Sequence, residues 1–431
     1  MSEQHALASA LAAVVGSDYV LGDLAGRAGY AVQGVVPGCV AAPGSLEELA
    51  AVLRIAHEHG AAVAPWGGGT HQQIGNPPGR LGLVVRTGRL NAVLMHEPAD
   101  LTISVGAGMT IGALRDYLGQ HRQMLPLDPP LPARATIGGL IATAADGPRR
   151  LGYGTLRELL IGITVVEAGG RVSRAGGMVV KNVSGFDMMK LYHGSLGTLA
   201  VIASANFKLL PLPRASATLL CRFGRSAAAF AAIDALQRTQ LTPTAAEYLN
   251  RGALSALEFG GECALALRAE GLPAAVERHL SDLRTLALAH EATDTTRLDH
   301  DQDTEFWLRV ADLPQLADLA GDEAVIKLAT LPGATEQAIG QIEALAARNG
   351  GQASISARAL NGVIYARLRP LGATTERALL AALPGLQWVA CALQGVPRWG
   401  EQPPGLDLMR RIKGEFDPAG QINPGRYVEG L

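Results

Sequence analysis

Three stretches of the chain carry residue types suited to binding an anion through the main chain. Residues 65–70 read Pro-Trp-Gly-Gly-Gly-Thr, and residues 135–143 read Ala-Thr-Ile-Gly-Gly-Leu-Ile-Ala-Thr. The third, Lys-Asn-Val-Ser-Gly-Phe-Asp at 181–187, runs on into Gly-Ser-Leu-Gly-Thr-Leu at 194–199. Glycine has no Cβ, so backbone N–H groups in such segments can converge on a negative group. Together the stretches predict a cradle for an extended, doubly charged cofactor.

The first stretch predicts a phosphate-binding loop. An apolar segment at 61–65 is typical of a buried strand and leads into the triple glycine, and Thr70 adds a hydroxyl donor. An ordinary glycine turn is the alternative, and the strand and the hydroxyl favour phosphate. The loop is not of the nicotinamide-binding type, because the glycine and prolines of 75–78 leave no helix to face the phosphates. The glycines at 106–112 are one residue too widely spaced for that fingerprint.

The second stretch combines small residues with Thr136 and Thr143, so it can lie against a flat ring system while its hydroxyls reach polar edges. A turn at Tyr153-Gly154 lies close enough in sequence to touch the same cofactor. We interpret the arginines nearby as a solvated rim rather than as direct phosphate ligands: Arg149, Arg150 and Arg157.

The pattern of apolar residues predicts the elements that position these stretches. Ser45, with Glu48 three residues on, caps a helix that ends near His59. We expect a further helix at 110–120 and strands at 61–65, 81–86, 101–105, 159–167 and 197–210. After the prolines of 211–213, Ala/Leu helices at 227–237 and 335–349 alternate with strands at 262–268 and 363–368, which predicts a smaller α+β domain with one sheet. A last helix begins at Leu406.

Composition excludes several classes of protein. Among 431 residues, 37 basic and 39 acidic side chains give a formal charge of -2, so we expect neither nucleic acid nor an anionic membrane as a partner. The four cysteines are widely separated, which argues against a zinc ribbon, an iron–sulfur cluster or a disulfide framework, and fits a reducing cytosol. The apolar run at 6–15 is too short to span a bilayer and is predicted to form a first amphipathic helix.

With these motifs in place, residues 30–212 and the Asn-Pro-Gly-Arg of 423–426 resemble the flavoproteins of the p-cresol methylhydroxylase and vanillyl-alcohol oxidase type. Within that family, the runs at 135–139, 181–187 and 197–199 look like the branch that oxidises D-2-hydroxy acids. Gly-Pro-Arg-Arg at 147–150, the segment 151–157 and the short C-terminal half are similar to the FAD-binding subunits of glycolate oxidases. The resemblance implies an α+β fold in which a two-lobed FAD-binding domain is covered by a smaller α+β cap domain. The expected division is an N-terminal helical segment at 1–29, the FAD-binding domain at 30–213, the cap at 214–400, and a tail at 401–431 that returns to the FAD-binding domain.

The resemblance also implies where FAD binds. The triple glycine with Thr70 matches the pyrophosphate loop, residues 136–143 match the segment along flavin and phosphates, and Gly197 with Val201 and Ile202 match the part that meets ribose and adenine. The full set of predicted cofactor-binding residues is Trp66, Gly67, Gly68, Gly69, Thr70, His71, Gly75, Ala135, Thr136, Ile137, Gly138, Gly139, Ala142, Thr143, Gly147, Tyr153, Gly154, Gly197, Val201, Ile202 and Arg426. Relatives with covalent FAD carry histidine where this chain has Thr70, and His71 is one residue out of register, so we expect non-covalent FAD.

Oxidation of a 2-hydroxy acid needs a hydride acceptor, a base near the hydroxyl and a cation for the carboxylate. Arg309, beside Trp307, is the predicted carboxylate cation in the cap, although a structural role is the alternative. Lys181, Asp187 and His193 are candidates for the reactive side of the flavin, while Asp187 could instead cap a turn or pair with Lys190. The cap histidines at 279, 290 and 300 are too far apart for the metal site of stand-alone D-lactate-type relatives, so we expect no metal.

The resemblance and the scattered cysteines together predict a subunit of a larger enzyme. We expect a second FAD-containing catalytic subunit and an iron–sulfur subunit as partners, and a small 2-hydroxy acid such as glycolate as substrate. The protein is expected in the cytoplasm, with membrane contact on the inner face only through its partners. Two alternatives stay open: a stand-alone FAD-dependent D-2-hydroxy-acid dehydrogenase, and a non-catalytic scaffold subunit, with or without flavin.

Overall fold

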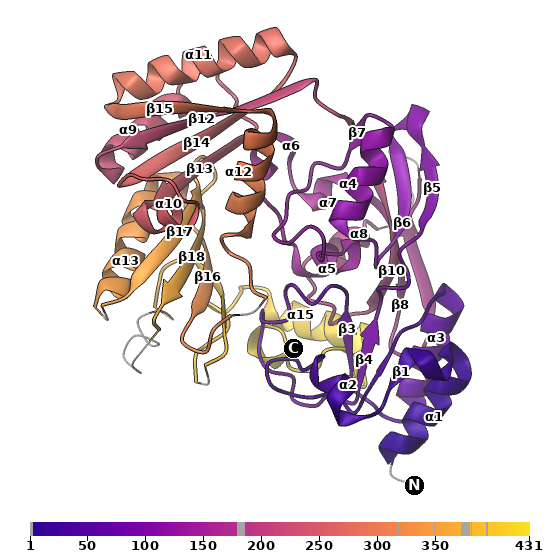
Figure 1. Cartoon of the computed structure of the whole chain (residues 1–431). Coiled ribbons are helices and arrows are strands. Elements are labelled where there is room, and N and C mark those ends of the chain that lie inside the picture. Colours follow the sequence, from indigo (N-terminus) through magenta and orange to yellow (C-terminus); the bar gives the residue numbers. More distant parts are fainter. Residues whose placement is uncertain are drawn as a thin grey trace.

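The structure is a computed structural model that describes residues 3–178, 186–317, 319–348, 350–371, 380, 382–393 and 395–431. Figure 1 shows two halves, one built around two sheets that the N-terminal part of the chain forms, and one around a single large sheet. The yellow C-terminal segment returns to the first half. The α+β fold class is therefore as predicted.

The first sheet carries the glycine loop. Its order is β1 (Val20–Leu21), β2 (Cys39–Ala41), β4 (Leu83–Arg86) and β3 (Val63–Trp66), and β4 is parallel to both β2 and β3. Helices α1 (Glu3–Val15) and α3 (Leu46–Glu58) pack on it through a core that includes Leu11, Leu49 and Leu53. Ser45 caps α3 by accepting a hydrogen bond of 3.1 Å from the Glu48 amide, as its position in the sequence predicts.

The second sheet is antiparallel and has the order β5 (Val93–Glu97), β6 (Thr102–Gly106), β10 (Val201–Lys208), β8 (Leu160–Val166) and β9 (Val172–Gly176). Helix α4 (Ile111–Gln120) is the helix predicted at 110–120, with Thr110 as its cap. The stretch at 135–143 contains a short helix that the sequence did not predict, α5 (Ile137–Thr143), whose apolar side joins the core of this sheet. Three further one-turn helices lie nearby: α6 (Arg150–Tyr153), α7 (Leu156–Leu159) and α8 (Met189–Tyr192).

The third sheet is antiparallel with eight strands, in the order β15 (Ala292–Asp299), β12 (Ala215–Phe223), β14 (Cys263–Gly271), β13 (Ala245–Asn250), β17 (Gln352–Arg358), β18 (Val363–Arg369), β16 (Ala324–Ala329) and β19 (Leu386–Cys391). One face is covered by α9 (Ser226–Gln237), α11 (Pro273–Ala289) and α13 (Thr335–Ala347). On the other face, α12 (His300–Asp312) packs near one end, and the rest is turned toward the first half of the molecule.

The predicted elements are largely confirmed, with shifts of a few residues at their ends. The helices predicted at 227–237 and 335–349 are α9 and α13, and the strands predicted at 262–268 and 363–368 are β14 and β18. The helix predicted from Leu406 is α15 (Leu406–Phe416).

The segment after α15 is tied to the first sheet. The amide of Val63 donates to the Gln421 carbonyl, and the Asn423 amide donates to the Val63 carbonyl, both at 2.8 Å. Asp417, which is buried, accepts from Lys413 Nζ at 2.6 Å and from the Ile422 amide at 2.7 Å. Residues more than 350 positions apart in the sequence therefore form one rigid wall beside β3.

Candidate functional site

A cavity lies where β3, α5, the start of β10 and the C-terminal tail meet, and it encloses about 690 Å³. Its wall is made by all three motifs predicted to bind a cofactor: Pro65, Trp66, Gly67, Gly68, Gly69, Thr70, His71, Gln72, Thr87, Thr136, Gly138, Gly139, Ala142, Thr143, Leu196, Gly197, Ala200, Val201, Ile202, Asn423 and Arg426.

The glycines are needed because the two N-terminal motifs touch each other. A Cβ on Gly67 would lie 2.1 Å from Thr136 Oγ1, and one on Gly68 would lie 1.8 Å from the Arg134 carbonyl oxygen. Gly69 has φ +72°, a conformation that favours glycine. The first loop can therefore follow the segment at 134–136 in van der Waals contact only without side chains.

The tail supplies the positive charge of this cavity. Arg426 is 1 % exposed, and its guanidinium donates to three carbonyls of the loop after the glycines, those of Gln72, Ile74 and Asn76, at 2.8–2.9 Å. Burial and the nearby Arg398 lower the pKa of Arg426 to about 10, so it remains charged at neutral pH. Asn423, fixed by donation to the Leu196 carbonyl at 2.8 Å, joins the tail to the third motif.

The wall suits a diphosphate better than a cation. Among the described residues that form it, Arg426 is the charged one and none is acidic. Two buried polar atoms of the wall, Asn423 Oδ1 and Arg426 Nε, have no hydrogen-bond partner. Because buried polar atoms are nearly always satisfied in folded proteins, these atoms indicate that a polar ligand completes the site.

A second cavity adjoins the first, on the side of the eight-stranded sheet. Two residues, His71 and Thr143, line both cavities. The second is the smaller of the two, with about 360 Å³ of open space. Its remaining wall is mainly apolar and comes from both halves of the molecule: Ile74, Pro130, Ala145, Asp146, Pro314, Leu316, Lys327, Tyr365 and Trp388.

Three neighbouring strands place one side chain each in this second cavity. Lys327 of β16 is directly opposite Tyr365 of β18 and Trp388 of β19 in the strand register. Side chains alternate between faces along a strand, so Ile326 and Leu328 enter the core under the helices whereas Lys327 faces the first half. Lys327 Nζ lies 5.6 Å from the centre of the Tyr365 ring. The rings of Tyr365 and Trp388 lie 6.2 Å apart.

His71 stands at the junction of the cavities as a neutral imidazole. Its Nδ1 lies 2.9 Å from Thr70 Oγ1. Burial, and after it the positive charge of Lys327, lower the pKa of His71 to about 4. The ring is therefore unprotonated at neutral pH and available to accept a proton.

A buried ion cluster joins the two halves beside the second cavity. Arg358 of β17 pairs with Asp146, which also pairs with Arg150 at 2.7 Å. Although burial opposes ionisation, Arg358, Lys327 and Arg150 hold the pKa of Asp146 at about 2. Glu247 lies 3.7 Å from Arg358, and burial raises the pKa of Glu247 to about 8.

Most, but not all, of the predicted cofactor-binding residues line the first cavity. Fifteen of the predicted residues are in its wall, and Figure 1 shows the elements that bring them together around α5 and β3. The structure places the remaining ones outside that wall: Gly75, Ala135, Ile137, Gly147, Tyr153 and Gly154. Gly75 contacts the Arg426 carbonyl, and Ala135 and Ile137 are core residues. The 147–154 segment turns instead toward the ion cluster, because Ala144 ends α5 in a left-handed conformation.

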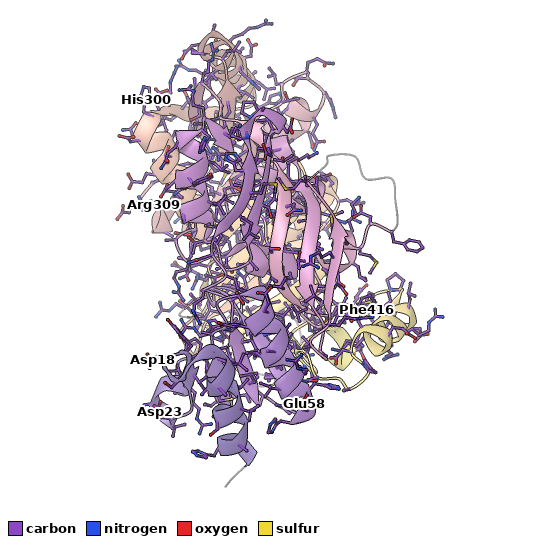
Figure 2. The ribbon with its side chains drawn as sticks, turned by 90° about the vertical axis from the view of Figure 1, so that its right-hand side faces the viewer. Asp18, Asp23, Glu58, His300, Arg309 and Phe416 are labelled. Atoms are coloured by element: carbon purple, nitrogen blue, oxygen red, sulfur yellow. The ribbon has the colours of Figure 1, made fainter. Side chains whose placement is uncertain are left out.

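Two interpretations made from the sequence need correction. Arg309 does not reach either cavity: it projects from the outer side of α12 (Figure 2) and pairs with Glu258 at 3.0 Å. Arg149 and Arg150 are not a solvated rim. Arg149 pairs with Glu270 of the eight-stranded sheet at 2.6 Å, across the boundary between the two halves, and Arg150 pairs with Asp146 of its own half.

The other candidate residues are placed as follows. Lys181 lies outside the described residues. Asp187 pairs with Lys190 at 2.5 Å, which was one of the alternatives. Within the described part of the chain, no group of histidine, cysteine or acidic side chains is arranged to hold a metal ion. None of the described helices is long and apolar enough to cross a membrane.

The sequence analysis did not predict three residues of the second cavity, Lys327, Tyr365 and Trp388. One signal was present for the lysine, which is the single charge in the otherwise apolar strand Ala-Val-Ile-Lys-Leu-Ala. A charge that interrupts a buried strand generally faces a polar feature.

Comparison with known proteins identifies the class of this chain. Residues 37–176 match the family described as FAD binding domain, and residues 398–427 match the C-terminal domain of FAD linked oxidases. The two matches contain most of the wall of the first cavity. The chain therefore carries an FAD binding domain and the C-terminal domain of FAD linked oxidases, its cofactor is FAD, and it is an FAD-dependent oxidoreductase.

The chain is also similar to two proteins named as glycolate oxidase subunits and to one solved structure. It is 26 % identical to glycolate oxidase subunit GlcD of Bacillus subtilis over 418 residues, which are 91 % of this chain and 89 % of GlcD. It is 36 % identical to glycolate oxidase subunit GlcE of Escherichia coli over 147 residues, 34 % of this chain and 41 % of GlcE. The crystal structure of p-cresol methylhydroxylase with substrate bound superposes with a TM-score of 0.77 at 15 % identity, over 99 % of this chain and 97 % of that one, which shows the fold.

Proposed function

We propose that this chain is the FAD-binding subunit of a glycolate oxidase complex, which oxidises glycolate or a similar short 2-hydroxy acid to the 2-oxo acid. The observation that carries the proposal is the pair of adjoining cavities. The larger suits a dinucleotide with a diphosphate, and the smaller adjoins it and is lined by a lysine and a neutral histidine. The names of GlcD and GlcE support the reaction and the multi-subunit assembly.

In this proposal the first cavity holds FAD without a covalent bond. The residues that would bind its diphosphate are the main chain of 67–70 and Arg426, and Thr136, Gly138 and Gly139 would lie along the cofactor. Bound FAD supplies an acceptor for two electrons as a hydride. The chain's own residues would exclude water, orient the acid and take up the hydroxyl proton.

The partners are proposed to be a second FAD-containing catalytic subunit and an iron–sulfur subunit that receives the electrons. In that assembly the chain would stay in the cytoplasm and meet the inner membrane face only through those partners. The second cavity is the smaller of the two and is walled mainly by apolar and aromatic side chains, which favours a substrate of few carbon atoms.

Purification through a tag on this chain tests the proposal. We expect flavin and the other subunits to be recovered together, and we expect glycolate to bleach the flavin in the absence of oxygen and yield glyoxylate. A chain recovered alone and fully active with an artificial acceptor would instead make it a stand-alone D-2-hydroxy-acid dehydrogenase. A flavin that light reduces, but that no 2-hydroxy acid reduces even in the complex, would show a scaffold and contradict the proposed reaction.

A further inference from the structure

The second cavity holds a cation, Lys327, that forms no ion pair with any carboxylate of the described residues. In the described part of the chain, Lys327 has no ion-pair partner, whereas Asp146, the acidic residue of the same wall, is bound by Arg358 and Arg150. Most of the remaining wall is apolar or aromatic, so solvent screens Lys327 poorly. A half-buried ammonium group such as that of Lys327 attracts a small anion.

The same cavity also offers a proton acceptor. His71 lines both cavities, so its ring lies between the space for the cofactor and Lys327. If Nδ1 donates its hydrogen to Thr70 Oγ1, at 2.9 Å, the imidazole is held with Nε2 unprotonated. Burial and Lys327 keep the ring neutral well below pH 7.

We propose that Lys327 binds the carboxylate of a short 2-hydroxy monocarboxylic acid and that Nε2 of His71 accepts the proton of its 2-hydroxyl group. Oxidation to the 2-oxo acid removes one hydride, for which bound FAD would supply the acceptor, and one proton, which passes to His71 as the C–O bond becomes a carbonyl. The assignment rests on the proposed function for the identity of the oxidant. It adds the acid's two contact residues, one from each half of the molecule.

The shape of the wall restricts the acid to a short one. Tyr365 and Trp388 flank Lys327 on both sides, and Leu316, Ile74 and Pro130 close the remaining space. A second carboxylate on the substrate would meet Asp146 rather than another unpaired cation. The site therefore selects monocarboxylates over dicarboxylates of similar length.

Binding and chemistry can be tested separately with a probe that cannot react. The acid 2-hydroxy-2-methylpropanoate has the carboxylate and the hydroxyl but no hydrogen on C2. Its dissociation constant is measured on the FAD-loaded full chain by calorimetry and by the change in flavin absorbance. We expect Lys327→Met to weaken the probe by at least about tenfold, since the charge partner of the carboxylate is lost, while Lys208→Met, which changes a lysine outside both cavities, leaves it unchanged.

The rate of flavin reduction, measured beside probe affinity, should distinguish His71→Asn from Lys327→Met. We expect probe affinity within about threefold of wild type, but flavin reduction by glycolate slower by roughly 10²–10⁴, the usual contribution of a general base. In the wild type the reduction rate should fall as pH approaches 4, where both His71 and the substrate's own carboxylate gain protons, and this fall should be shallower in His71→Asn. The other ionisable groups that line the same cavities are Lys327, Asp146, Tyr365 and Arg426. Asp146 is already ionised at that pH, because the neighbouring cations hold its pKa at about 2.

Two results would overturn the assignment. One is unchanged probe affinity in Lys327→Met, and the other is a wild-type reduction rate and pH profile in His71→Asn. Failure of the proposed function looks different: the wild type would bind the probe in a Lys327-dependent way, yet glycolate would not reduce its flavin.

Discussion

Replacement of Gly68 by alanine tests the cofactor loop most sharply. The added Cβ would lie 1.8 Å from the Arg134 carbonyl oxygen, whereas Cβ atoms in proteins essentially never come closer than 3.0 Å to another heavy atom. The neighbour is backbone, so it cannot turn away as a side chain would. The loop and the 134–136 segment must therefore separate by more than an ångström, and the main-chain amides of 67–70 move with them.

The magnitude follows from the cost of forcing atoms into a packed site, about 1–3 kcal/mol. If that cost is paid when the loop closes on the cofactor, FAD should bind roughly 5- to 150-fold more weakly, because about 1.4 kcal/mol corresponds to tenfold. The assay is titration of FAD into the apoprotein, followed by flavin fluorescence, together with the flavin content of the protein as purified.

Gly79→Ala is the matched control. A Cβ on Gly79 meets no atom within 4 Å, so this variant should bind FAD like the wild type. Circular dichroism confirms that both variants are folded. If folded Gly68→Ala bound FAD as tightly as Gly79→Ala, the contact between the loop and residue 134 would play no part in holding the cofactor, and the proposed binding mode would be refuted.

Three further predictions concern the cofactor bond and the seam between the halves. Protein precipitated with acid should release all its FAD and have the mass of the bare polypeptide, and a retained flavin mass would contradict non-covalent binding. Asp146→Asn should reduce the free energy of unfolding by about 3–5 kcal/mol in urea titrations, because it leaves Arg358 buried without its closest partner. The control Glu291→Gln, in an exposed pair with Arg225, should change the free energy of unfolding by less than about 1 kcal/mol. Equal effects of the two variants would show that the buried pair does not join the halves. Burial raises the pKa of Glu247 to about 8, so the folded protein keeps a proton that the unfolded chain has released, and stability should fall as pH rises from about 5 through 8. Glu247→Gln should lessen that fall in thermal unfolding scans, and an unchanged pH dependence would contradict the raised pKa.

The cofactor cavity could be predicted from the sequence because its signals are local. A triple glycine after a strand, and small residues with threonines at fixed spacing, each specify a backbone that approaches something closely. The 147–154 segment was assigned to the same cavity by its nearness in sequence, which fails once α5 ends and the chain turns toward the ion cluster.

The second cavity could not be predicted in the same way. Lys327, Tyr365 and Trp388 become neighbours only through the order and register of β18, β16 and β19, which no local pattern specifies. The prediction of Arg309 failed on helix geometry: residues two apart on a helix point about 200° apart, so when Trp307 is buried against Thr218, Arg309 must face outward.

A crystal structure of the full chain with FAD and 2-hydroxy-2-methylpropanoate bound would test the central claim most directly. We expect the diphosphate against the main chain of 67–70 and Arg426, the flavin ring along α5, and the probe between Lys327 and His71 with its carboxylate on Nζ. FAD bound away from the glycine loop, or the acid bound outside the cavity that His71 shares with Lys327, would contradict it.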